Sequence, residues 1–112
     1  MPLTSLRRVA IIGGARIPFC RSGTLYSELS NLEMMTTAVT GVVDKFALSG
    51  ALIGEVAGGA IVSHSRDWNL AREAVIGTKL DPATPATTMQ MACGTGLQAA
   101  SGLAAKIAVG EI

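Results

Sequence analysis

The sequence predicts an α/β fold with a mainly parallel sheet built from βαβ units. Three short apolar runs, 8–14, 55–62 and 86–92, alternate with stretches in which apolar residues recur at helical spacing. Almost half of the 112 residues are hydrophobic and only 4% are aromatic, which suits close packing through small side chains. A chain of this length is expected to form one domain with a buried core.

The three expected strands differ in their glycine content. Residues 8–14 (RVAIIGG) form a branched apolar run that ends in glycines, and residues 86–92 (ATTMQMA) form the third run. The middle run, 55–62 (EVAGGAIV), carries Gly58 and Gly59, which indicate that another backbone approaches it closely. Because a three-stranded sheet exposes its edges, the sequence predicts part of a larger sheet.

The first expected helix has a clear start. Ser30 and Glu33 form an S-x-x-E capping box, and the helix is expected to end near Ser49 and Gly50. Its apolar face comprises Leu32, Met35, Thr36, Val39, Val42, Val43 and Phe46.

Two further helices follow the second and third strands. One begins near residues 67–69 and ends at Gly77, and the other follows Cys93 and ends near Gly110. The residues of the earlier helix that should point inward are Leu70, Ala71, Ala74 and Val75.

Composition excludes several classes of function. The formal charge is +1, without the basic stripe that phosphate-backbone binding requires, so nucleic acid is not an expected partner. No apolar run reaches the roughly 20 residues that span a bilayer, and the amino end lacks a secretory or organelle-targeting pattern. We therefore expect a cytoplasmic protein with no membrane span, whose Cys20 and Cys93 remain thiols.

Most candidate sites have a simpler interpretation. The glycine turn after the first run lacks the third glycine of a dinucleotide fingerprint. His64 fits a solvated loop residue, Trp68 a packing anchor and Cys20 a small residue of no special role, although Arg16 and Arg21 could favour its thiolate. One histidine and two cysteines do not suggest a zinc site, so no metal is expected.

Cys93 is the strongest candidate for chemistry. It stands where the third strand should become a helix, and a helix N-terminus stabilises a thiolate through free N–H groups and the helix dipole. Gly94 and Gly96 would leave room for an acyl group and let the helix approach the sheet, and backbone N–H groups at such a turn can face an oxyanion. The residues alone leave two interpretations open, a nucleophile and a buried structural cysteine.

Residues 88–105 (TMQMACGTGLQAASGLAA) resemble the nucleophile segment of the thiolases, an N-x-x-C-G-S-G-like strand-to-helix turn. Gln90 stands in place of the Asn and Thr95 in place of the Ser. Residues 8–19 (RVAIIGGARIPF) are similar to the first strand and Arg-Thr-Pro turn of that family, with Ile17 for Thr. Residues 69–77 (NLAREAVIG) are similar to its N-x-A-R helix, and LAREA and MAC lean toward the fatty-acid-oxidation type.

The resemblance implies a thiolase-like fold and a covalent mechanism. Cys93 would be the catalytic nucleophile, attack the keto carbon of a 3-ketoacyl-CoA and carry the acyl group until CoA removes it. The implied partners are acyl-CoA and CoA as substrates, with no bound cofactor, and the full enzyme would be a homo-oligomer.

Several family motifs do not occur in the sequence, namely the G-H-P histidine, the N-E-A-F-like segment and the C-G-G cysteine. Residues 1–112 are therefore expected to be an incomplete thiolase N-terminal domain without turnover of its own. Two alternatives stay open: a fragment of a ketoacyl-synthase-like condensing enzyme, and a non-catalytic assembly module with the thiolase fold.

Overall fold

The structure is a computed structural model that describes residues 5–112; residues 1–4, which belong to the amino end considered above, lie outside the described part. Its sheet has two parallel strands, β1 (Val56–Gly58) and β2 (Ala86–Thr88), with Val56 paired to Ala86 and Gly58 to Thr88. The predicted α/β class and the parallel βαβ arrangement are confirmed.

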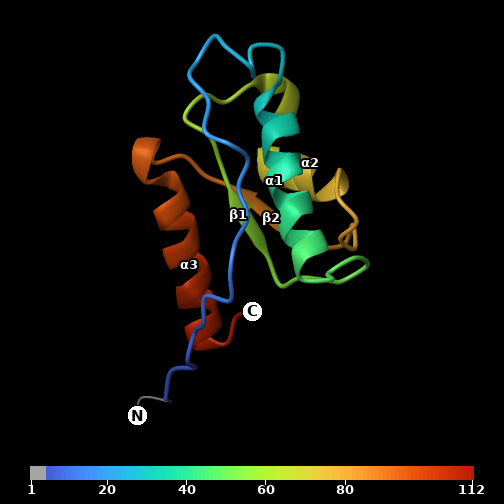
Figure 1. The fold of residues 1–112 in the computed structure, drawn as a ribbon. Helices are drawn as coiled ribbons and strands as arrows, with labels where there is room; N and C mark the ends of the chain where they lie inside the picture. The colour runs from blue at the N-terminus through green and yellow to red at the C-terminus, as the bar shows by residue number, and fades with distance from the viewer. Residues whose placement is uncertain (1–4) are drawn as a thin grey trace.

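Three helices surround this sheet on two sides. α2 (Leu70–Ile76) joins β1 to β2 and packs on both strands, and α1 (Asn31–Lys45) packs on α2. α3 (Thr95–Val109) contacts β1 and lies on the opposite side of the sheet from α1 and α2 (Figure 1). Two short 3-10 turns, η1 (Ser65–Asp67) and η2 (Ala92–Gly94), precede α2 and α3.

The predicted start of α1 is confirmed in atomic detail. The Ser30 hydroxyl accepts a hydrogen bond from Glu33 N at 3.1 Å, and the Glu33 carboxylate accepts one from Ser30 N at 2.7 Å. The helix ends at Lys45, before the expected position near Ser49. The chain turns away through Ala47, whose φ of 52° is incompatible with continuing an α-helix.

The core lies between the α1–α2 layer and the sheet. All four residues predicted to point inward from α2, Leu70, Ala71, Ala74 and Val75, are buried. Val43 of α1, Val75 of α2 and Leu80 form the central cluster, against which Val56 of β1 packs. The burial of α2 is the main tie between the helices and the two strands.

Gly59 confirms the predicted close backbone approach just after β1. A Cβ atom at this position would lie 1.9 Å from the Met89 carbonyl oxygen and 2.9 Å from Cγ2 of Thr95. Gly58 O accepts a hydrogen bond from Met89 N at 2.9 Å at the same place. Only a residue without a side chain lets the backbone after β1 meet the backbone after β2 here.

The expected first strand, residues 8–14, is wrong for this structure. Within the described residues no ladder hydrogen bond joins it to β1 or β2, and Ile11 and Ile12 are 95% and 84% exposed. The segment instead passes between α3 and α1 (Figure 1), where Arg7 N donates to Ala108 O and Lys45 Nζ to Gly14 O. An apolar run becomes a strand only when a neighbouring strand supplies its hydrogen bonds.

Two smaller expectations also need correction. β1 and β2 keep only residues 56–58 and 86–88 of the longer predicted runs. Trp68 is 79% exposed and therefore is not a packing anchor. His64 is exposed on its loop, as predicted.

Candidate functional site

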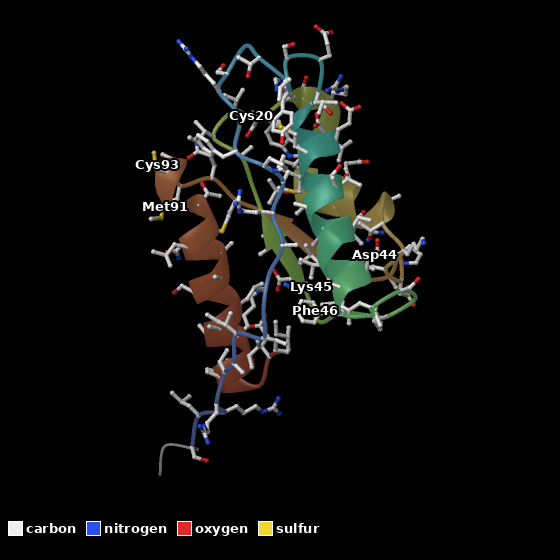
Figure 2. All side chains as sticks on the ribbon, viewed as in Figure 1. Cys20, Asp44, Lys45, Phe46, Met91 and Cys93 are labelled. Carbon is white, nitrogen blue, oxygen red and sulfur yellow. The ribbon has the colours of Figure 1, made fainter. Side chains whose placement is uncertain are left out.

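Cys93 lies in the η2 turn between β2 and α3, at the exposed amino end of α3 (Figure 2). Its side chain is exposed, so it is not a buried structural cysteine. Both cysteines are free, as predicted. A solvent-accessible thiol at this position meets the first requirement of a nucleophile, which is access to its substrate.

The backbone just before Cys93 is strained. Ala92 has a φ of 44°, in the left-handed region that residues with a side chain rarely adopt, at a cost on the order of 1 kcal/mol or more. Two hydrogen bonds oppose this cost: Ala92 N donates to Oε1 of Gln90 at 2.7 Å, and Gly94 N donates to Met91 O at 2.9 Å. The sharp bend lifts Cys93 out of the strand direction.

Thr95 holds the bend from the other side. Its buried hydroxyl accepts a hydrogen bond from Met91 N at 2.9 Å and donates one to Ala92 O at 2.8 Å. One side chain thus fastens the first turn of α3 to both residues that precede Cys93. Sequence reasoning treated Thr95 and Gln90 only as departures from a motif; their polar side chains within three residues of the cysteine were the available signal.

The amino end of α3 is left open beside the thiol. Gly94 is the N-cap residue and supplies no side-chain hydrogen bond, and the first turn contains no acidic residue. The positive end of the helix dipole is therefore not neutralised by the helix's own side chains. This arrangement favours negative charge at the exposed end, which suits both a thiolate and an oxyanion.

The two glycines after Cys93 differ in what surrounds them. A Cβ at Gly96 would meet nothing within 4 Å, so Gly96 borders open space and does not bring α3 closer to the sheet, contrary to one expected role. A Cβ at Gly94 would meet only the end of the Met91 side chain, at 2.9 Å. Close packing on the sheet depends on Gly59 instead.

The N-x-A-R residues support the strand that leads to Cys93. Oδ1 of Asn69 accepts hydrogen bonds from Arg72 N at 3.1 Å and from the Thr88 hydroxyl at 2.7 Å. Arg72 Nη1 donates to Thr84 O at 2.9 Å, just before β2. Both residues therefore fasten α2 to β2 and act on the position of the turn, at a distance from the thiol itself.

The other candidate side chains lie apart from this turn. His64 lines a small pocket with Asp67 and Trp68, and Cys93 is outside it. Cys20 contacts Tyr26, whose pKa is raised by burial and by a hydrogen bond with that thiol. In residues 5–112 no hydrogen bond joins the Cys93 thiol to another side chain.

The described residues show neither a metal-binding cluster nor a helix that could span a membrane. Residues 5–112 contain no group of three or more His, Cys, Asp or Glu side chains placed to hold a metal ion. The helices among them are too short or too polar to cross a membrane.

Comparison with known proteins places this turn in context. The family model described as thiolase, N-terminal domain, matches residues 9–112. A 3-ketoacyl-CoA thiolase of Serratia proteamaculans is 33% identical over 94% of this chain and 24% of its own length. The corresponding protein of Aliivibrio fischeri is 32% identical over 99% of this chain and 26% of its own length.

A human protein is also similar to this chain. The mitochondrial trifunctional enzyme subunit beta of Homo sapiens is 31% identical over 96% of this chain and 23% of its own length. The chain therefore spans about a quarter of the length of these curated relatives.

Proposed function

The chain belongs to the thiolase family, and on that premise we propose that Cys93 is the nucleophile of a CoA-dependent acyl transfer. The observation that carries the proposal is the exposed Cys93 thiol beside the uncapped amino end of α3. Exposure gives the thiol access to a thioester, and the open helix end favours the negative charge that the reaction requires.

The proposed substrates are acyl-CoA thioesters and CoA. Relatives named 3-ketoacyl-CoA thiolase support a 3-ketoacyl-CoA as the substrate of the whole protein. The Cys93 sulfur adds to the keto carbon, and cleavage of the carbon–carbon bond leaves an acyl-cysteine while the departing acetyl-CoA carbanion takes up a proton. The thiol of CoA then attacks the acyl-cysteine, which releases acyl-CoA and regenerates the Cys93 thiol.

The residues around Cys93 have distinct parts in this proposal. Thr95 and Gln90 hold the turn that presents the thiol, and are positioning residues. Backbone N–H groups at the start of α3 would stabilise the oxyanion formed when sulfur adds to the carbonyl carbon. The groups that move protons are not assigned to residues of this chain.

Intact-mass analysis after incubation with acetyl-CoA or acetoacetyl-CoA tests the nucleophile. We expect one acyl adduct, located at Cys93 by peptide mapping, and its loss in Cys93→Ala. Cys20→Ala is the matched control, because it removes the other free thiol and should leave the adduct unchanged. An adduct that persists in Cys93→Ala and disappears in Cys20→Ala would show that the wrong thiol has been chosen.

Turnover is a separate question from acylation. We expect the 112-residue chain to accept an acyl group without sustaining CoA-dependent cleavage of acetoacetyl-CoA, since the sequence contains no G-H-P or C-G-G motif. Release of acetyl-CoA, followed by chromatography, measures this directly. Sustained cleavage that depends on Cys93 would contradict the expectation; a chain that forms no adduct would instead favour the assembly module. Homo-oligomerisation stays a prediction.

A further inference from the structure

Asp67 is the most anomalous polar residue in the described chain. It is 5% exposed, and neither oxygen of its carboxylate has a hydrogen-bond partner. Arg66 is close, with 3.7 Å between its Nε and Oδ1 of Asp67, but this separation is too long for a hydrogen bond and the Arg66 side chain is 73% exposed. A buried carboxylate without partners is costly, and such groups commonly mark an ion or an ordered water.

Asp67 lines a small void between α1, β2 and the loop before α2. The void has a volume of about 10 Å³, roughly the space of one water-sized particle. The other polar residues of its lining are Asn31, Ser63, His64 and Thr88, and Val62 contributes to the lining as well. The wall is fixed rather than open: Asn31 Nδ2 donates to Val62 O at 3.0 Å, and Asp67 N donates to His64 O at 3.3 Å.

We propose that this void is a binding site for a monovalent alkali cation, K⁺ or Na⁺, held by the Asp67 carboxylate. The charge matches, because one buried carboxylate is neutralised by one positive charge. The surrounding donors match as well, since hard cations prefer carboxylate, hydroxyl and carbonyl oxygens.

Other ligands fit this void less well. Ca²⁺ usually takes six to eight oxygens from several acidic residues, and Mg²⁺ retains bound waters for which about 10 Å³ leaves no room. A guanidinium or ammonium side chain is larger than the void. A water molecule fits by size but adds no positive charge, and the ion pair with the largely exposed Arg66 is weakened by solvent.

A cation here would connect three parts of the chain. Thr88 is the last residue of β2, and its hydroxyl already accepts a hydrogen bond from Ala71 N at 2.9 Å. Asn31 opens α1, and Asp67 closes η1. The bound ion would therefore stabilise the end of the strand that continues to the Cys93 turn. This inference does not rest on the proposed acyl transfer.

Thermal unfolding in different chloride salts tests the proposal. The melting temperature of the full chain is measured in KCl, NaCl and tetramethylammonium chloride at equal ionic strength; the last cation is too bulky for the void. We expect a higher melting temperature in KCl or NaCl, by roughly 5 °C at a concentration about ten times the dissociation constant. The rise should saturate as K⁺ or Na⁺ replaces tetramethylammonium.

Two variants locate the effect. Asp67→Asn should abolish the difference between the salts, whereas Asp44→Asn, which removes an exposed carboxylate at the far end of α1 (Figure 2), should keep it. If Asp67→Asn does not fold, the wild-type titration decides alone: a saturable rise supports the site. Equal melting temperatures in all three salts overturn the proposal, as does a salt difference that survives in Asp67→Asn.

Discussion

The two long helices, α1 and α3, begin in opposite ways. α1 starts with a complete capping box, in which Ser30 and Glu33 satisfy each other's backbone N–H groups. α3 has the same length, but its N-cap is Gly94, which supplies no side-chain hydrogen bond. The first helix closes its own positive end, and the second leaves that end available to whatever approaches Cys93.

The start of α3 lacks the local stabilisation that a side-chain cap provides. The start of α3 is held by hydrogen bonds between the Thr95 hydroxyl and the backbone of Met91 and Ala92, and no side chain caps the first N–H groups of the helix. Such fastening holds the turn in place while its positive end stays open. The start of α3, next to the thiol, therefore lacks the side-chain cap that the start of α1 has, and it can interact with an approaching substrate.

Of changes at the two helix starts, replacement of Thr95 should have the largest effect on stability. Thr95→Val preserves shape but leaves Met91 N without its partner and removes one of two hydrogen bonds to Ala92 O, so the free energy of unfolding should fall by about 1–3 kcal/mol. Thr95→Ser keeps the hydroxyl and should recover most of that loss. Urea denaturation measures both variants. If Thr95→Val were as stable as wild type, the hydrogen bonds of the Thr95 hydroxyl would not be what holds this turn.

Closing the open end of α3 should slow the chemistry of Cys93. Gly94→Asp places a carboxylate beside the thiol, where its charge opposes formation of the thiolate, and alkylation by iodoacetamide at neutral pH should slow roughly tenfold. Gly94→Asn has nearly the same shape without the charge and is the control. The Gly94 backbone (φ −89°) accepts either residue. Equal rates for the two variants would mean that the open end does not act on the thiol.

Loss of the α1 cap should weaken the fold without touching the thiol. Ser30→Ala removes one half of the capping box and should lower the free energy of unfolding by about 1 kcal/mol. The rate of Cys93 alkylation should not change. Ser27→Ala, a nearby exposed serine, serves as the reference in the same denaturation experiment. A slower alkylation in Ser30→Ala would show that the start of α1 affects the reactivity of Cys93, contrary to this prediction.

Acid should weaken the start of α1 by a smaller amount. Hydrogen bonds from the backbone and side chain of Ser30 hold the pKa of Glu33 below its ordinary value of 4.5. A lowered folded-state pKa means that this contribution is complete above pH 4.5 and is lost as pH falls through the lowered value. The difference in melting temperature between wild type and Glu33→Gln should therefore shrink from pH 7 to pH 3. A constant difference would contradict this assignment.

The elements that the sequence predicted well depend on near neighbours. The capping box lies within four residues, and the inward face of α2 follows from helical spacing alone. The end of α3 was equally clear, because Gly110 adopts a φ of 81° that glycine accommodates. The sequence motif around Cys93 was recognisable, although the positive φ of Ala92 that shapes the turn was not predicted.

The elements that were missed depend on distant partners. Residues 8–14 read as a strand, yet no neighbouring strand pairs with them in the described chain. Trp68 is a large aromatic residue of the kind that usually packs against other side chains, but here it lies exposed on a loop. The burial of Asp67 arises from how separate segments meet, which no local pattern encodes.

The contact at Gly59 also has a genetic consequence. Every missense change at a glycine codon adds at least a Cβ, and here that atom would overlap the backbone oxygen of Met89 at 1.9 Å. Backbone cannot rotate aside as a side chain can, so chemically gentle and drastic replacements meet the same obstacle. In a library of variants, we expect every replacement of Gly59 to be about equally damaging. The reason is the short distance between the two backbone segments, so the polarity or charge of the new side chain should make little difference.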